Sequence, residues 1–168
     1  MSCCNDDFYV NSCGFIVDKC GVGCGRRNVN TISGCGCFNN LVQGSFVSTI
    51  EQNVSSGNLI SLPTTITNNG INVENNNAFS VYQAGTYRVD YGVNSNNSSS
   101  ATIGLNVNNV LQAGSTITVD SPAKNVSNSL ILNLENPSTL SLITTNGTLN
   151  LANGSTNAFL NISLLHTN

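Results

Sequence analysis

All seven cysteines of this chain lie within its first 37 residues, and the rest of the 168-residue chain contains none. This distribution predicts two regions: a cross-linkable segment, residues 1–40, and a domain, residues 41–168, that must fold by burial and backbone pairing alone. Seven is an odd number, so disulfides within one chain cannot pair every thiol, and a partner chain or a free thiol is implied. The candidates for disulfides between subunits are Cys3, Cys4, Cys13, Cys20, Cys24, Cys35 and Cys37.

The composition of the chain indicates a polar but nearly neutral surface. Only 8% of its residues are charged, against roughly 25% in typical soluble domains, and Asn, Ser, Thr and Gly supply the polarity. A net charge of −3 and a pI near 4.7 argue against a nucleic-acid partner. Low net charge favours association, so we interpret the surface as that of a protein that assembles. The alternative is a neutral surface without such a role.

From about residue 41 onward, short β-type runs alternate with turn residues, and no helix is expected. Asn-Gly pairs at residues 69–70, 146–147 and 153–154 favour turns because both residue types tolerate positive φ. Many short strands at this spacing are typical of a sandwich or jelly roll. The expected strands are Gly44–Val54, Leu59–Leu62, Ile71–Glu74, Ala78–Tyr82, Gly85–Asn94, Ala101–Val107, Ser115–Val119, Asn128–Leu134, Thr139–Thr144 and Ala158–His166.

One segment, Phe79-Ser-Val-Tyr-Gln-Ala-Gly-Thr-Tyr-Arg-Val-Asp-Tyr91, combines strand alternation with a tight Ala-Gly corner. It resembles the signature of the complement and tumour-necrosis-factor-like jelly rolls, in which Phe is followed after five residues by Gly-x-Tyr. The resemblance implies an all-β, antiparallel jelly-roll sandwich that follows a largely irregular connector. It also implies a signature core of Phe79, Gly85, Tyr87, Val89 and Tyr91.

Three further segments resemble the bacterial branch of that family: Leu105–Ser115, Ser129–Leu142 and Ala158–Leu165. The relatives that this pattern suggests are surface proteins of bacterial endospores, namely exosporium layer proteins, heads of exosporium filament glycoproteins and subunits of endospore appendage fibres. The resemblance implies jelly-roll homotrimers, some with a Cys-rich connector, located on the spore surface and oxidised there. Other spore-surface proteins would be further partners.

The start of the chain lacks the positive n-region of a signal peptide, and no apolar run approaches the ~18 residues that a membrane span requires. We therefore expect a protein made without a signal peptide and without a membrane partner. Because cytosolic thiols stay reduced, the cysteines require either a bound metal or oxidising surroundings reached by another route.

The cysteines allow three interpretations. Structural zinc usually takes two Cys-x2–4-Cys pairs, so Cys20 and Cys24 with Cys35 and Cys37 form a possible four-thiolate site. The last pair is spaced too tightly for the usual zinc knuckle, which favours disulfides, including at least one between chains. Unreacted thiols are the third possibility, and no cofactor is expected.

Catalysis is poorly supported. The single histidine, His166, is the third residue from the end, and the acids Glu51, Glu74, Asp90, Asp120 and Glu135 are scattered. A nucleophile with a neighbouring base, or a pair of carboxylates, is therefore not visible, and we expect no enzyme.

The leading hypothesis is a structural subunit that self-assembles on a spore surface, as an exosporium layer or an appendage fibre, through trimers joined by intermolecular disulfides. The alternative is a ligand-binding trimeric adhesin head that the Cys-rich segment anchors. A zinc or thiol enzyme is the third class. The sequence does not separate a fibre from a flat layer, and it leaves the disulfide connectivity open.

Overall fold

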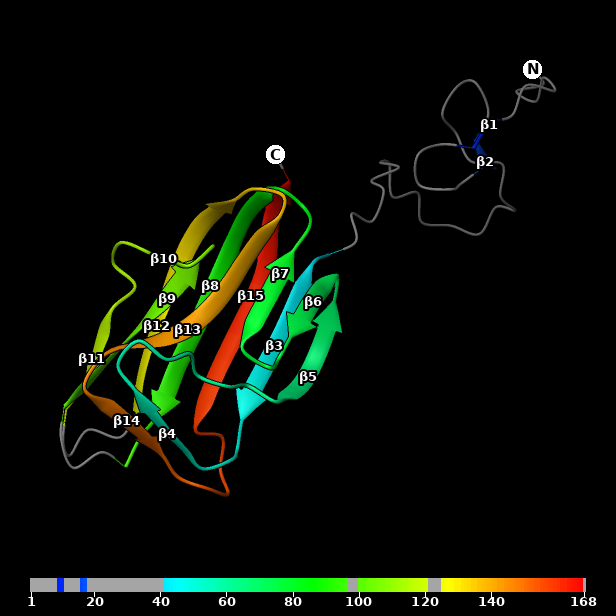
Figure 1. Cartoon of the computed structure of the whole chain (residues 1–168). Helices are drawn as coiled ribbons and strands as arrows, with labels where there is room; N and C mark the ends of the chain where they lie inside the picture. The colour runs from blue at the N-terminus through cyan, green and yellow to red at the C-terminus, as the bar shows by residue number, and fades with distance from the viewer. Residues whose placement is uncertain (1–8, 11–15, 18–40, 97–99, 121–124, 168) are drawn as a thin grey trace, which may run out of the picture. The chain divides into compact units, whose positions relative to one another are not determined.

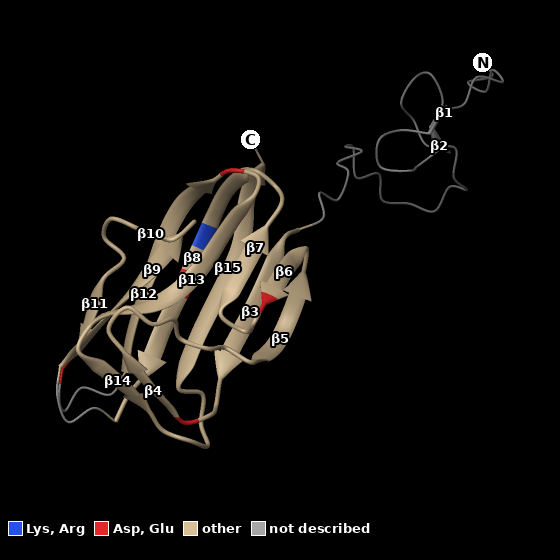
Figure 2. Ribbon diagram, in the orientation of Figure 1, with Lys and Arg blue, Asp and Glu red and all other residues tan. Residues whose placement is uncertain are grey.

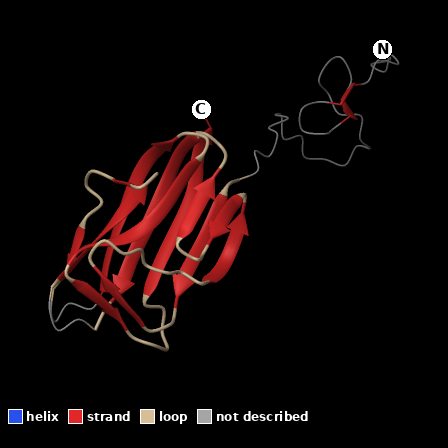
Figure 3. Ribbon diagram, in the orientation of Figure 1, coloured by secondary structure: helices blue, strands red, loops and turns tan. Residues whose placement is uncertain are grey.

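The computed structural model describes residues 9–10, 16–17, 41–96, 100–120 and 125–167. The chain divides into two compact units, Met1–Asn39 and Asn40–Asn168. In the first unit, β1 (Tyr9–Val10) and β2 (Ile16–Val17) pair antiparallel with each other. The second unit is built of strands and contains no helix among its described residues (Figure 3).

The second unit is a sandwich of two antiparallel sheets (Figure 1). The five-stranded sheet has the order β12-β8-β15-β3-β5, and the six-stranded sheet has the order β10-β9-β13-β7-β6, with β11 also paired to β9. A separate ribbon pairs β4 with β14. The strands are β3 (Gln43–Ser48), β4 (Gln52–Ser55), β5 (Thr64–Asn69), β6 (Ile71–Glu74), β7 (Ala78–Val81), β8 (Gly85–Asn94), β9 (Ala101–Val107), β10 (Val110–Leu111), β11 (Ile117–Val119), β12 (Asn125–Leu134), β13 (Ser138–Asn146), β14 (Thr148–Leu151) and β15 (Ala158–Thr167).

The order of the strands is that of a jelly roll. The chain crosses from one sheet to the other between β7 and β8, between β8 and β9, and again between β12 and β13. The last strand, β15, inserts between β8 and the first long strand, β3. The expectation of an all-β, antiparallel jelly roll is therefore confirmed.

Alternating side chains of the two sheets fill the core. Along β8, Tyr87, Val89 and Tyr91 are fully buried, while Arg88 is exposed and Asp90 is partly exposed. Phe46 on β3 and Phe79 on β7 meet across the two sheets, with ring centroids 4.4 Å apart. Burying each such side chain contributes about 1.5–3 kcal/mol, so the sandwich is stabilised by a core that contains no cysteine.

Asparagine supplies two tight turns. Asn75 and Asn76 link β6 to β7, and Asn108 and Asn109 link β9 to β10, all four with φ between 49° and 64°. Such paired left-handed residues match the twist of a hairpin. At the predicted Asn-Gly turns the glycine takes the positive φ, as at Gly70 between β5 and β6.

Two expected strands were wrong. The segment Gly44–Val54 is not one strand, because the chain turns at residues 49–51 and continues as β4 in the separate ribbon. Gln52 Nε2 donates a 2.7 Å hydrogen bond to Ser48 Oγ across this turn. The segment Leu59–Leu62 makes only an isolated bridge, Leu59 with Ile143. Its backbone bonds go to different partners, Ile60 N to Leu142 O and Leu62 N to Asn76 O, which prevents a continuous ladder.

In the second unit, three strands were not expected: β5, β10 and β14. Every residue of β5 is exposed, so this edge strand lacks the apolar alternation on which the sequence reading depended. β14 has buried Leu149 and Leu151, but it is only four residues long.

Candidate functional site

The signature residues lie in the core rather than on a surface. Phe79 belongs to the six-stranded sheet, whereas Tyr87, Val89 and Tyr91 belong to the five-stranded sheet, and all four are fully buried. Gly85 begins β8 against the end of β15, where a Cβ would overlap the carbonyl oxygen of His166 and lie 2.7 Å from Leu164 Cδ1. Tyr87, Val89 and Tyr91 therefore occupy the inner face of the five-stranded sheet, and the opposite face of that sheet can contact solvent or a partner.

The two buried tyrosines have partners for their hydroxyl groups. Tyr87 donates a 2.8 Å hydrogen bond to the carbonyl of Gln83. Tyr91 donates to the carbonyl of Ser115 and accepts from Asn128 Nδ2 at 3.2 Å. Burial raises the pKa of both hydroxyls, and for Tyr91 the hydrogen bonds with Asn128 and Ser115 oppose part of that rise. Both tyrosines serve as neutral structural donors.

All seven candidate cysteines lie outside the described residues, including the four considered for zinc. In the part of the chain that the structure describes, no group of three or more His, Cys, Asp or Glu side chains gathers to hold a metal. His166 lies in β15 and is exposed. The described ranges also contain no helix, and hence none able to cross a membrane.

The side of the five-stranded sheet that faces away from the core is its outer face. The register of its strands groups the outward side chains of β12, β8, β15 and β3 into three rows. The Ile131 row contains Ile131, Arg88, Ser163 and Gln43; the Ser129 row contains Ser129, Asp90, Asn161 and Ser45; and the Phe159 row contains Ser127, Gly92, Phe159 and Val47. We call these three rows the outer face.

The outer face is polar over most of its area and carries a few apolar side chains near its two ends. In the Ile131 row the side chain of Ile131 is 68% exposed, and Leu165, two residues beyond Ser163 on β15, is 54% exposed. In the Phe159 row, Phe159 and Val47 are half-buried. Between these ends lies the Ser129 row, made of hydroxyl, amide and carboxylate side chains.

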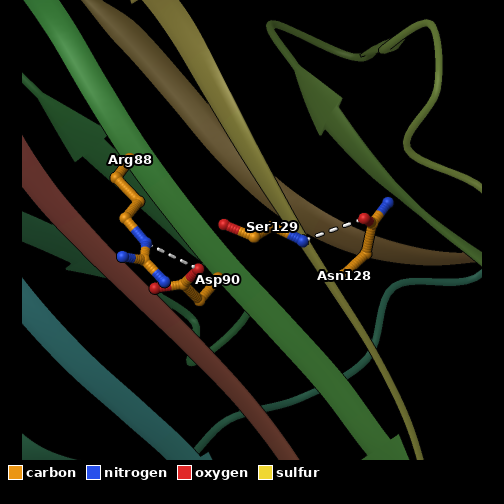
Figure 4. A network of polar contacts seen from close by, with 4 residues as sticks. All are labelled: Arg88, Asp90, Asn128 and Ser129. Carbon is orange, nitrogen blue, oxygen red and sulfur yellow. Dashed lines mark hydrogen bonds and ion pairs between the residues drawn. The ribbon is translucent and has the colours of Figure 1, made fainter.

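The outer face carries two charges, and they neutralise each other. Arg88 Nε donates a 3.0 Å hydrogen bond to Asp90 Oδ1, two residues along the same strand. On the neighbouring β12, Ser129 N donates to Asn128 Oδ1 at 2.9 Å (Figure 4). Arg88 is the one Lys or Arg among the described residues, and Figure 2 shows the blue of a basic residue on β8. A face with paired charges can be covered without leaving an unpaired charge buried.

The outer face was not among the sites predicted from the sequence. The alternation on β8 predicts its inward residues, but a strand pattern does not show whether the polar face meets solvent or a partner. Ile131, an apolar residue between Leu130 and Leu132, breaks the alternation on β12. That break was the available signal.

Solved structures share this fold at low sequence identity. The globular domain of zebrafish complement 1qA superposes with a TM-score of 0.60 at 11% identity, covering 76% of this chain and 99% of that chain. The tumour necrosis factor Eiger from S. frugiperda gives 0.62 at 13% identity, covering 77% and 95%. Murine APRIL gives 0.57 at 10% identity, covering 74% and 99%.

Among curated protein sequences, none matches the chain. The family described as the BclA C-terminal domain matches residues 44–166, which is nearly the whole of the jelly roll. The chain therefore belongs to the BclA C-terminal domain family, the family of the C-terminal domain of a collagen-like exosporium protein, and it carries this family's complement/tumour-necrosis-factor-like jelly roll.

Proposed function

We propose that this protein is a structural subunit of the spore surface, whose jelly roll forms a homotrimer through the outer face. The observation that carries the proposal is a sheet face on the side opposite the core that is neutral, carries no unpaired charge, and exposes Ile131 and part of Phe159 and Val47. Depletion of charge at the centre of a contact is typical of protein interfaces. The family membership supports an exosporium location.

The row arrangement suits a threefold axis that runs along the strands. Rotation about such an axis does not change the position of a residue along the axis. Each row therefore meets the residues at the same position along the axis on the neighbouring subunits. The Ile131 row would then meet the Ile131 row of its neighbours, which brings Ile131 beside the side chains of that row, and the Ser129 row would meet hydroxyl, amide and carboxylate groups. Covering Ile131 alone contributes about 1.5–3 kcal/mol for each subunit.

The Cys-rich segment would join the trimers into a fibre or lattice through disulfides between chains. The support for this step is the odd number of thiols and their confinement to residues 1–37. A jelly roll stabilised without cysteine leaves the thiols free to cross-link. The disulfides would give the assembly a mechanical and chemical resistance that contacts between weakly charged surfaces do not provide.

Light scattering after size-exclusion chromatography tests the trimer. The wild-type chain under reducing conditions should elute as a trimer, and Ile131→Asp should dissociate it by placing a charge in the contact. Val110→Asp is the matched control, because Val110 is 64% exposed on β10 of the other sheet. A monomeric wild type, or a trimer unaffected by Ile131→Asp, would refute this use of the outer face.

Electrophoresis of native material with and without reductant tests the cross-links. We expect ladders or material retained at the gel origin without reductant, and monomer with it. Replacing all seven cysteines by serine should remove the ladder and leave the trimer intact. A monomer band without reductant would refute cross-linked assembly, while isolated trimers in electron micrographs of native material would favour the adhesin alternative.

A further inference from the structure

Three Asn-Gly pairs lie among the described residues, at positions 69–70, 146–147 and 153–154. In such a pair the backbone nitrogen of the glycine can attack the side-chain carbon Cγ of the asparagine. Glycine favours this attack because it has no Cβ to block the approach and because its backbone turns easily. The nitrogen and Cγ must still rotate into contact, so the surroundings of each pair decide whether it reacts in the folded protein.

The Asn146-Gly147 pair is held by hydrogen-bonded strands. Asn146 is the last residue of β13 and pairs with Thr102 of β9. The carbonyl of Gly147 accepts a 2.9 Å hydrogen bond from Ser56 N. A Cβ on Gly147 would lie 2.5 Å from the carbonyl oxygen of Ser100. The backbone of this pair therefore has little room to rotate.

The Asn69-Gly70 pair is restrained through its side chains. Asn69 Nδ2 donates a 2.9 Å hydrogen bond to the carbonyl of Leu41. The neighbouring Asn68 side chain accepts from Ile71 N at 3.1 Å and donates to Ile71 O at 2.8 Å, so it closes the turn around Gly70. Rotation of Asn69 would have to break the first bond, and rotation of the turn would have to break the other two.

The Asn153-Gly154 pair lies in the segment that joins β14 to β15 (Figure 1), and both residues are exposed. The side chain of Asn153 makes no hydrogen bond to any described residue. A Cβ on Gly154 would meet nothing within 4 Å. The backbone restraint is a 3.0 Å hydrogen bond from Gly154 N to the carbonyl of Thr49, which must open before the nitrogen reacts. This pair is therefore less restrained than the other two.

We propose that Asn153 is a site of spontaneous deamidation in the folded protein. The backbone nitrogen of Gly154 gives its proton to hydroxide and forms a bond to Asn153 Cγ. The Cγ–Nδ2 bond breaks, and the departing group takes a proton from water and leaves as ammonia. Water then opens the resulting succinimide ring at either carbonyl, which gives aspartate or isoaspartate at this position. The net reaction consumes water and releases ammonia.

The reaction changes both the charge and the main chain of this segment. A carboxyl group with a pKa of about 4 is ionised at neutral pH, so one further negative charge takes the net charge of the chain from −3 to −4. In isoaspartate the main chain runs through the former side chain and is longer by a methylene group. Asn157 Nδ2 bonds the carbonyls of Ile50 and Ala152 at 2.7 and 2.6 Å. These bonds fix both ends of the segment, so residues 153–156 must accommodate the added length.

Peptide mapping by mass spectrometry tests the proposal on the full-length protein, incubated in mildly alkaline buffer with its thiols reduced. Fragmentation separates isoaspartate from aspartate. We expect conversion at Asn153 to be at least about tenfold faster than at Asn69 or Asn146, because local opening costs least in exposed loops. In protein unfolded by urea the three sites should convert at similar rates, because glycine follows each asparagine.

Gly154→Ala should slow the conversion of Asn153 by at least about tenfold, because the added Cβ hinders the attacking nitrogen. Gly114→Ala is the matched control: Gly114 also has a positive φ and open surroundings, but it follows Ala113. It should leave the rate at Asn153 unchanged. Asn153→Gln retains the amide but would have to close a larger ring, so its protein should lack the acidic form that ion exchange separates from the wild type.

A native rate at Asn153 no higher than the rate at Asn69 or Asn146 would overturn the proposal. So would a rate at Asn153 that Gly154→Ala leaves unchanged. The proposed trimer is tested separately, because neither residue of this pair belongs to the rows of the outer face. Fast conversion at Asn153 in a protein that is monomeric would leave the deamidation site standing and refute the trimer.

Discussion

The hydroxyl of Tyr91 donates a hydrogen bond to the backbone carbonyl of Ser115, and this bond joins the two layers of the sandwich. Tyr91 belongs to β8 of the five-stranded sheet, and Ser115 belongs to the segment between β10 and β11 of the other sheet. Ser115 Oγ in turn accepts from the backbone N–H of Leu105 at 3.2 Å. The core therefore contains a short polar connection, which makes the pairing of the two sheets specific.

Replacing Tyr91 by Phe removes the donor to Ser115 and the acceptor of Asn128. Leaving a buried polar group unpaired costs about 1–3 kcal/mol, so we expect the free energy of unfolding to fall by about this amount. Urea denaturation of the reduced protein measures it. Tyr82→Phe, at a position that is 56% exposed, is the control and should change the stability by less than about 0.5 kcal/mol.

High pH should destabilise the fold through the two buried tyrosines. Burial raises the pKa of Tyr87 and Tyr91 above the ordinary value of 10.0. At pH values above 10, the unfolded chain loses these protons while the folded protein retains them, so stability falls as pH rises. Below pH 10 both states are protonated and the contribution is constant. Denaturation between pH 8 and about pH 11 measures the slope, and a double Tyr87→Phe, Tyr91→Phe variant should show a smaller one.

Phe46→Ala should be among the most damaging single changes. Phe46 is fully buried and its ring contacts Phe79 of the opposite sheet. Loss of a buried Phe typically costs about 3–5 kcal/mol, and Phe46→Leu should cost less because it retains much of the volume. A denaturation midpoint of Phe46→Ala close to that of the wild type would contradict the packing described above.

Gly85→Ala tests the close approach of β8 and β15. The added Cβ would meet the backbone carbonyl of His166, which cannot move without shifting β15. Overpacking usually costs about 1–3 kcal/mol. At Gly114 nothing lies within 4 Å of the added Cβ and only the positive φ opposes the substitution, so Gly114→Ala should cost about 1–2 kcal/mol. A loss well below about 1 kcal/mol for Gly85→Ala would show that the contact with His166 relaxes easily.

The ion pair of Arg88 and Asp90 should affect the formation of the trimer more than the stability of the monomer. Arg88 is 57% exposed in its side chain and Asp90 29%, and exposed pairs contribute about 0–1 kcal/mol. Arg88→Ala should therefore change the stability of the monomeric state very little. In the proposed trimer the same change leaves Asp90 unpaired in the contact, so the trimer should dissociate at higher protein concentration than the wild type. Sedimentation at several protein concentrations measures both states.

Much of the fold could be predicted from the sequence, because a half-buried strand alternates apolar and polar residues with a period of two. The strand Gly85–Asn94 was predicted with the bounds that the structure shows, as were Ile71–Glu74 and Ala101–Val107. Strands that lack this alternation were not predicted. β5 is exposed throughout, and it is a strand only because β3 provides hydrogen-bond partners at the sheet edge.

The sequence alone determined the separation of cross-linkable thiols from a β domain, and the inward residues of the long strands, because both depend on residue type and local spacing. Only the tertiary structure decided that Phe46 meets Phe79, that Arg88 and Asp90 share a face with Ile131, and that the ring of Phe159 lies close to Gly92. Register and sheet order bring these residues together from distant segments. Local sequence does not contain that information, because each strand can satisfy its backbone bonds with more than one neighbour.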